Sequence, residues 1–334
     1  MSITPGPAGR RHARHLTTLA VGLAAATALA GCNLSSSGSK TDEVKSGSLA
    51  KSVDLKGTSV TVGGKEFTEQ LILCQITSQA LTSVGAKVTE KCGLNGSNTV
   101  RDALTAGSID LYWEYTGTAW IGYLKHTTPI DDATKQYDAV AKEDKSKNKI
   151  TWLDPAPYNS TYAIVANGEV AKKYGVKTLS DFAKLAKANP AVAKTCGASE
   201  FLARNDGWPG LQKAYGFTLP SADLATIAEG AIYNAVGKGK TCNFGEGDTT
   251  DGRIAALHLT VLQDDKGFFP VYNPAVTIRS SVLKKHPDLA KALNPIAAKL
   301  DLSTMQQLDA KVDIDGDKPE DVAHDWLKSK DFIG

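Results

Sequence analysis

The sequence lacks two features that would indicate a partner directly: a membrane-spanning hydrophobic run and a large excess of one charge. Its most apolar stretch, residues 16–30, has about 15 residues, whereas a helix needs roughly 20 to cross the hydrocarbon core of a bilayer. The formal net charge is only +2. This near-balance argues against a polyanionic partner such as nucleic acid.

The sequence also lacks the motifs of common enzyme sites. It has no Gly-x-Ser-x-Gly elbow and no phosphate-binding glycine loop. Cys-x-x-Cys is absent and the six histidines are scattered, which argues against a zinc site. Acidic pairs such as Asp131-Asp132 are more typical of solvated turns than of acid–base catalysis. We therefore expect neither an enzyme nor a bound metal or cofactor.

The N-terminus has the pattern of a bacterial lipoprotein signal. Three arginines precede the apolar run, which ends in Leu29-Ala30-Gly31-Cys32. Such a lipobox predicts that residues 1–31 are removed and that Cys32 is lipidated. A tether rich in serine and glycine follows, to which we assign residues 32–56. Loss of the three arginines would bring the formal charge from +2 to about −1. We expect a protein anchored by lipid on the extracytoplasmic face of the cell membrane.

Four cysteines remain once Cys32 is assigned to the lipid: Cys74, Cys92, Cys196 and Cys242. An even number in an oxidising compartment favours two disulfides, and four cysteines allow three pairings. The pairing that is local in sequence, 74 with 92 and 196 with 242, would place one bridge in each half of the chain. Free buried thiols are the alternative.

Short β-like runs alternate with helical periodicity, which predicts an α/β protein. The first part reads as strand, helix, strand, helix, strand over residues 59–63, 69–84, 86–90, 99–106 and 109–112. This order suits a parallel sheet. Further strands are expected at residues 161–166 and 271–278, and residues 194–198, 224–237 and 240–247 continue the α/β pattern between them. Ser180 is expected to cap a helix.

Three segments concentrate residues suited to ligand binding. Residues 63–70 form a glycine-rich turn from strand to helix, where free helix amides and Lys65 could meet an anionic group. Residues 111–118 follow another strand and are rich in aromatic side chains. Residues 154–162 contain two prolines before a strand and suit a crossing between lobes, and residues 268–273 suit the return crossing. Taken alone, the first segment is weak evidence, since Thr68 and Glu69 could simply cap the helix, and the aromatic stretch is more typical of a packed core.

Together these segments resemble the periplasmic-type binding proteins for glycine betaine, choline, carnitine and proline betaine. The resemblance extends from about residue 60 to residue 327. The matching motifs are Gly-Lys-x-Phe-Thr-Glu-Gln, Asp-Leu-Tyr-x-Glu-Tyr-Thr-Gly-Thr, Asn-x-Thr-Tyr, Arg-x-Asp-Gly, Thr-Asp-Gly-Arg and Asp-Asp-Lys-x-Phe-Phe-Pro-x-Tyr. The resemblance implies a two-lobe periplasmic-binding-protein fold of type II with the ligand in the cleft. Lobe 1 would comprise residues 57–160 and 270–334, and lobe 2 residues 161–269.

The resemblance also implies the residues of a binding site. Tyr115, Tyr162 and Tyr272 would form an aromatic cage, with Thr118 beside the ligand. Lys65 and Arg204 would meet a ligand carboxylate, and Gln70 and Asn98 are weaker candidates. A cage suits this ligand chemically, because a trimethylammonium group has no N–H to donate and is held by shape and cation–π attraction. For Arg204, a salt bridge with a neighbouring acid is the alternative.

One position departs from the family pattern. The family usually has a cage aromatic just before its Thr-Asp-Gly motif, where this sequence has Asp248. Asp248 could pair with a ligand cation, or it could point away and leave a three-sided cage, for which Trp208 and Tyr233 are candidate fourth walls.

We therefore expect a monomeric receptor that delivers a small quaternary-ammonium osmoprotectant to the permease of an ABC importer. It would contact the membrane only through its lipid and would bind no nucleic acid. The alternatives are the same fold with an amino acid, polyamine or aromatic ligand, or a role in sensing.

Overall fold

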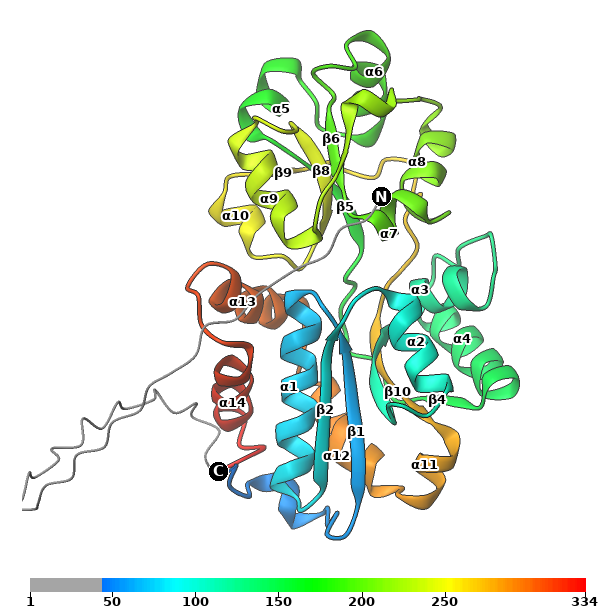
Figure 1. Cartoon of the computed structure of the whole chain (residues 1–334), viewed down its shortest axis with the longest axis vertical. Helices are drawn as coiled ribbons and strands as arrows, with labels where there is room; N and C mark the ends of the chain where they lie inside the picture. Colours follow the sequence, from blue (N-terminus) through cyan, green and yellow to red (C-terminus); the bar gives the residue numbers. More distant parts are fainter. Residues whose placement is uncertain (1–43) are drawn as a thin grey trace, which may run out of the picture. The chain divides into compact units, whose positions relative to one another are not determined.

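A computed structural model describes residues 44–334, which contain two five-stranded sheets with helices on both faces (Figure 1). The strand order is β2-β1-β3-β10-β4 in the first sheet and β7-β6-β8-β5-β9 in the second. The chain builds most of the first sheet, passes to the second, and returns with β10. The predicted signal sequence and Cys32 lie outside the described residues.

The first sheet begins with the predicted strand–helix alternation. These elements are β1 (Ser59–Lys65), α1 (Thr68–Ser83), β2 (Lys87–Leu94), α2 (Ser97–Thr105) and β3 (Leu111–Tyr115). β1 pairs in parallel with both β2 and β3, which confirms the predicted parallel arrangement. Because parallel strands end at the same edge of a sheet, Lys65 and Tyr115 come close to one another.

Later segments complete this sheet and cover it. β10 pairs antiparallel with β3, and β4 pairs antiparallel with β10. The remaining elements are α3 (Thr116–Thr118), the π-helical turn η2 (Ala119–Tyr123), α4 (Ala133–Asn148), β4 (Ile150–Trp152), β10 (Pro274–Arg279), α11 (Ser280–Lys285), α12 (Asp288–Ala297), α13 (Leu302–Asp313) and α14 (Pro319–Ser329).

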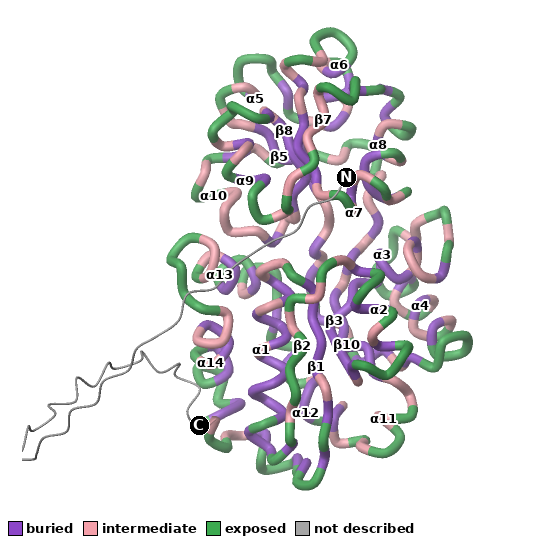
Figure 2. Tube along the Cα trace, in the orientation of Figure 1, coloured by how far each residue is buried: buried purple, intermediate pink, exposed green. Residues whose placement is uncertain are grey.

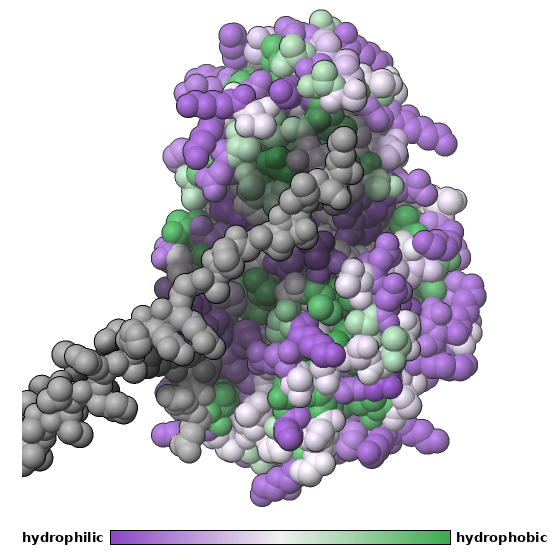
Figure 3. All heavy atoms as spheres, viewed as in Figure 1, coloured by the Kyte–Doolittle hydropathy of each residue, from purple (hydrophilic) through white to green (hydrophobic). Residues whose placement is uncertain are grey.

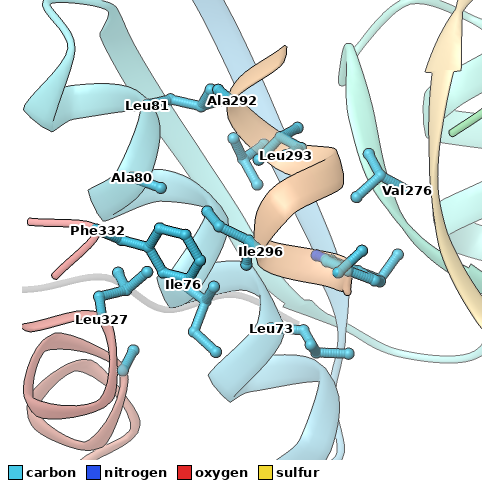
Figure 4. Packing of buried hydrophobic residues seen from close by; sticks show 14 of the residues in the cluster. Leu73, Ile76, Ala80, Leu81, Val276, Ala292, Leu293, Ile296, Leu327 and Phe332 are labelled. Carbon is cyan, nitrogen blue, oxygen red and sulfur yellow. The ribbon is translucent and has the colours of Figure 1, made fainter. Parts of the chain in front are cut away.

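Alternation along β3 explains the two cores of this sheet. Successive strand residues point to opposite faces, so Leu111 and Trp113 pack on one face and Tyr112 on the other. The first face meets α1, α12 and α14, where Ile76, Leu293 and Ile296 pack together (Figure 4). The buried strands between exposed helical surfaces are visible in Figure 2.

The second sheet is built from the middle of the chain. Its elements are β5 (Tyr162–Ala166), α5 (Gly168–Tyr174), α6 (Leu179–Ala188), β6 (Thr195–Gly197), α7 (Ser199–Ala203), α8 (Trp208–Tyr215), η3 (Ser221–Asp223), β7 (Leu224–Thr226), α9 (Glu229–Lys238), β8 (Phe244–Asp248), α10 (Arg253–Ala256) and β9 (Thr260–Val261). Ile164 packs on one face of β5 and Val165 on the other. We call the two halves, each with its own sheet, lobe 1 and lobe 2.

Two chain crossings and several hydrogen bonds join the lobes. Residues 153–161 lead from β4 to β5, and residues 262–273 lead from β9 to β10. At the second crossing, the Tyr272 amide donates to the Asn159 side chain at 2.7 Å, so β10 begins at Pro274 and not at the predicted residue 271. Gln306 of α13 donates to the carbonyl of Thr249 at 3.0 Å.

Both disulfides follow the pairing that is local in sequence. Cys74 of α1 is bonded to Cys92 of β2, and Cys196 of β6 is bonded to Cys242 just before β8. Each bond lies within one lobe. The alternatives of free thiols or of a bridge between the two halves are therefore not observed.

Two local expectations need correction. The tether does not extend to residue 56, because Leu49, Val53 and Leu55 are buried in the core of lobe 1 after the short helix η1 (Ser48–Lys51). The cap of α6 is Thr178 and not Ser180. The Thr178 hydroxyl accepts from the amide of Asp181, whose carboxylate accepts in return, and this reciprocal arrangement satisfies two otherwise unpaired amides.

Candidate functional site

A cavity of about 930 Å³ lies between the lobes and is lined by residues from both of them. Hydrophilic residues border the recess between the lobes on the face in Figure 3. Eight of the predicted ligand-binding residues line this cavity: Lys65, Asn98, Tyr115, Thr118, Tyr162, Arg204, Asp248 and Tyr272. The ninth, Gln70, is buried behind it.

Four aromatic side chains line the cavity, each from a different part of the chain. Tyr115 ends β3, Tyr162 begins β5 and Tyr272 lies on the return crossing. The rings of Tyr162 and Tyr272 are 5.3 Å apart and meet edge to face. Phe67, which the sequence did not single out as a site residue, lies 6.1 Å from the Tyr115 ring.

Tyr115 is held by a buried hydrogen-bond network in lobe 1. Its hydroxyl donates to Glu69 at 2.7 Å and accepts from the Gln70 amide at 3.0 Å. Glu69 also accepts from the hydroxyls of Tyr158 and Ser160. Gln70 therefore positions Tyr115 from behind and does not itself line the cavity.

Tyr272 is fixed by a hydrogen bond and by close packing. Its hydroxyl donates to the buried carboxylate of Asp206 at 2.7 Å. Its ring lies directly on Gly117, where an added Cβ would come within 2.6 Å of a ring carbon. Glycine at residue 117 is thus required for the ring to occupy this place.

Lys65 forms a buried ion pair inside lobe 1. Its ammonium lies 2.7 Å from Glu114, and the two side chains are 4% and 0% exposed. Glu114 also accepts from the hydroxyls of Tyr112 and Tyr123 at 2.6 Å each. The Lys65 ammonium lies 4.9 Å from the centre of the Tyr115 ring, so it borders the cavity while remaining paired.

Arg204 is likewise paired within the protein, as the alternative to a ligand contact anticipated. It donates to Glu200 at 2.7 Å and to Asp206 at 2.5 Å. Burial alone would raise the pKa of Glu200, but the charges of Lys65 and Arg204 lower it to about 2. A further 3.4 Å contact joins Arg204 to Thr118 of lobe 1, and Glu200 accepts from the Ser97 amide at 2.9 Å.

Asp248 lies beside the aromatic rings. It is the strand partner of Tyr162 in the β5–β8 ladder, so both side chains lie on the same face of the sheet, and both line the cavity. Its side chain shares a hydrogen bond with Glu229. Burial, reinforced by the negative charges of Glu229 and Glu246, raises the pKa of Asp248 well above its usual value.

Neither Trp208 nor Tyr233 completes the ring of aromatics. Trp208 is buried in the core of lobe 2 against Phe182 and Phe217. Tyr233 lies behind β8, where its hydroxyl accepts from the Asp248 amide at 2.9 Å. Asp248 therefore stands where the family pattern has an aromatic side chain.

Several acidic residues of the cavity were not predicted. They include Glu229 at the start of α9, Glu246 of β8 and Asp309 of α13. No motif in the sequence marked them, and Asp309 comes from an element far in sequence from the other two. Among the described residues, no group of histidine, cysteine, aspartate and glutamate side chains has a metal-binding arrangement, and no helix is long and apolar enough to cross a membrane.

Comparison with known proteins decides the family. The substrate-binding domain of ABC-type glycine betaine transport systems matches residues 58–329. The chain belongs to this family. A glycine-betaine-binding protein of Pseudomonas aeruginosa is 38% identical over 277 residues, which cover 81% of this chain and 88% of that protein. The glycine betaine-binding protein YehZ of Escherichia coli is 37% identical over 287 residues, which cover 84% of this chain and 94% of YehZ.

A solved structure of the same family confirms the expected fold. A crystal structure of a glycine betaine/carnitine/choline ABC transporter protein matches with a TM-score of 0.66 and 32% sequence identity. The match covers 82% of this chain and 99% of the chain in that structure. The chain is thus an extracytoplasmic solute-binding protein with the two-lobe type II fold. The family acts in transport rather than catalysis.

Proposed function

We propose that this chain is the receptor that captures a small quaternary-ammonium osmoprotectant and delivers it to an ABC permease. The supporting observation is that Tyr115, Tyr162 and Tyr272 line one cavity between the lobes. The names of the relatives from P. aeruginosa and E. coli, both glycine betaine-binding proteins, point to the same ligand class. Glycine betaine, choline, carnitine and proline betaine are the candidates.

The chemistry of the cavity suits a methylated ammonium. Such a cation is poorly hydrated and offers no N–H donor, so aromatic faces are its natural partners, each contributing roughly 0.5–2 kcal/mol. Tyr115 belongs to lobe 1, Tyr162 begins lobe 2 and Tyr272 lies on the crossing. A ligand held among these rings would contact both lobes and stabilise their closed arrangement.

The other assigned residues would surround this cage. The Thr118 hydroxyl lies beside Arg204, and Asn98 lies in the first turn of α2 at the cavity edge. We assign lobe 1 to residues 57–160 and 270–334 and lobe 2 to residues 161–269. The sheet membership of the strands supports this division.

We further propose that Cys32 carries a lipid that holds the monomeric receptor at the outer face of the membrane. Growth with a labelled fatty acid should label the wild-type protein and leave Cys32→Ala unlabelled. Wild-type protein that takes up no label, or Cys32→Ala protein labelled to the same extent, would contradict the lipid anchor.

A calorimetric panel with the four candidate solutes tests the ligand class. Binding of at least one with a 1:1 stoichiometry, together with a rise in melting temperature by mass action, is expected. The solute should be recovered chemically unchanged, as expected for a binding protein rather than an enzyme. If all four fail while an amino acid, a polyamine or an aromatic solute binds, the proposed ligand class is wrong.

A further inference from the structure

The residues that line the cavity are predominantly acidic. Only three basic side chains, Lys65, Arg204 and Arg253, line it among the described residues. The acidic side chains that line it are Glu66, Glu69, Glu200, Glu229, Glu246, Asp248, Asp251 and Asp309. A zwitterionic betaine needs a cationic partner for its carboxylate, so the availability of the three bases decides whether such a ligand fits.

Each of these bases is already paired with a carboxylate of the protein. Lys65 is bound by Glu114 and Arg204 by Glu200 and Asp206. Arg253 is bound by Asp251 and also lies 3.4 Å from Asp313. A ligand carboxylate that recruited one of these cations would leave a protein carboxylate without its partner, and Glu114, Asp206 and Asp251 are all nearly buried.

By contrast, the lobe 2 side of the cavity carries acids without a basic partner in the described chain. We call Glu229, Glu246 and Asp248 the acidic wall. Asp248 and Glu246 are two residues apart on β8 and so share a face, and Asp248 shares a hydrogen bond with Glu229. A hydrogen bond between two carboxyl groups requires a proton on one of them. A donor on the ligand could replace that proton.

The opposite lobe offers an independent sign of a missing donor. Asp309 of α13 lines the cavity and is only 3% exposed. Its Oδ1 is buried and has no hydrogen-bond partner within the described chain. Buried carboxylate oxygens are almost always hydrogen-bonded, so this atom indicates a place for a donor group from outside the protein.

We propose that the cavity selects cationic quaternary-ammonium solutes whose second polar group donates hydrogen bonds, and that it discriminates against betaines with a carboxylate there. The methylated ammonium lies among the tyrosines, and the second group, an amine or a hydroxyl, binds the acidic wall. This inference rests on the proposed function and narrows its ligand class. It also gives Asp248 a role as the residue that determines specificity.

Three solutes with the same three-carbon skeleton test the inference. They are (3-aminopropyl)trimethylammonium, (3-hydroxypropyl)trimethylammonium and the (2-carboxyethyl)trimethylammonium zwitterion. Calorimetry should give the tightest binding for the amine and the weakest for the carboxylate, with at least about tenfold between these two, or about 1.4 kcal/mol. If the carboxylate compound binds as tightly as the amine or more tightly, the inference is wrong although the proposed function stands. If none of the three binds and the osmoprotectant panel also fails, the proposed function itself is wrong.

Variants then identify the residues that cause the preference for the amine over the carboxylate compound. Asp248→Asn keeps the size of the side chain and should reduce the preference for the amine over the carboxylate about tenfold. Glu229→Gln should act in the same direction and provides a second test if Asp248→Asn folds poorly. Glu169→Gln is the control, because Glu169 is an exposed acid of lobe 2 in the first turn of α5 and does not line the cavity. If both wall variants keep the wild-type preference, the acidic wall is not its cause.

Discussion

Replacing Tyr162 tests the aromatic cage most directly, because its hydroxyl can be removed separately from its ring. The hydroxyls of Tyr115 and Tyr272 are bound by Glu69 and Asp206, whereas that of Tyr162 has no hydrogen-bond partner in the described chain. Tyr162→Phe therefore keeps the whole aromatic wall, and Tyr162→Ala removes it.

The expected loss follows from the position of the ring. It lies 5.3 Å from Tyr272 and lines the cavity, so a bound methylammonium group would contact its face or edge. One cage wall contributes roughly 0.5–2 kcal/mol, and a loss near 1.4 kcal/mol corresponds to about a tenfold weaker Kd. Tyr162→Ala should thus bind choline about tenfold more weakly, and Tyr162→Phe should bind it within about twofold of the wild type.

Isothermal titration calorimetry measures the affinity of both variants for choline and for an uncharged analogue of choline. In 3,3-dimethylbutan-1-ol a carbon replaces the nitrogen of choline, so the shape is kept and the charge is lost. Cation–π attraction predicts a larger effect of Tyr162→Ala on choline than on this alcohol. Tyr174→Ala, which removes an exposed tyrosine of the same lobe, serves as the control. Unchanged choline affinity in Tyr162→Ala would place Tyr162 outside the cage.

Three further predictions concern the packing, the disulfides and the acidic wall. Gly117→Ala should displace the Tyr272 ring, weaken ligand binding in calorimetry and lower the free energy of unfolding by about 1–3 kcal/mol; wild-type affinity would contradict the packing argument. Removing the Cys196–Cys242 bond, with a sequence separation of 46, should cost about 4 kcal/mol in denaturant unfolding, more than the roughly 3 kcal/mol for the separation of 18 in the other bond. Burial raises the pKa of Glu229 from 4.5 to about 7, so the folded protein holds a proton that the unfolded chain releases, and stability should fall as pH rises between these values. Glu229→Gln should flatten this dependence in urea titrations, and an unchanged slope would assign it to other groups.

The fold was predictable because its signals are local. Period-two alternation and helical spacing define the β1–α1–β2–α2–β3 unit, and a parallel sheet follows from that order. The cage tyrosines were also accessible from sequence, since each lies in a motif at the end of a strand or in a crossing. Phe67 belongs to one of these motifs and could have been included.

Which charged side chains pair across the fold was not predictable from the sequence. For Arg204, a salt bridge with a neighbouring acid was the expected alternative, and Asp206 lies only two residues away. Lys65 looked available for a ligand carboxylate, and its partner Glu114, on another strand, could be recognised only once the strands were packed. Charge pairing depends on distances between side chains, and sequence spacing sets these distances only within a helix or strand.

The sequence by itself determined the family, the two-lobe fold and the tyrosines from which an aromatic cage could be built, because motifs and hydrophobic periodicity are properties of neighbouring residues. Tertiary structure alone decided the electrostatic character of the cavity. It brings Glu229 of α9, Asp248 of β8 and Asp309 of α13 to one cavity whose bases are already paired. Burying a carboxyl group without a partner costs free energy, and a ligand that donates a hydrogen bond to that group removes the cost. This is the physical basis for the proposed selection.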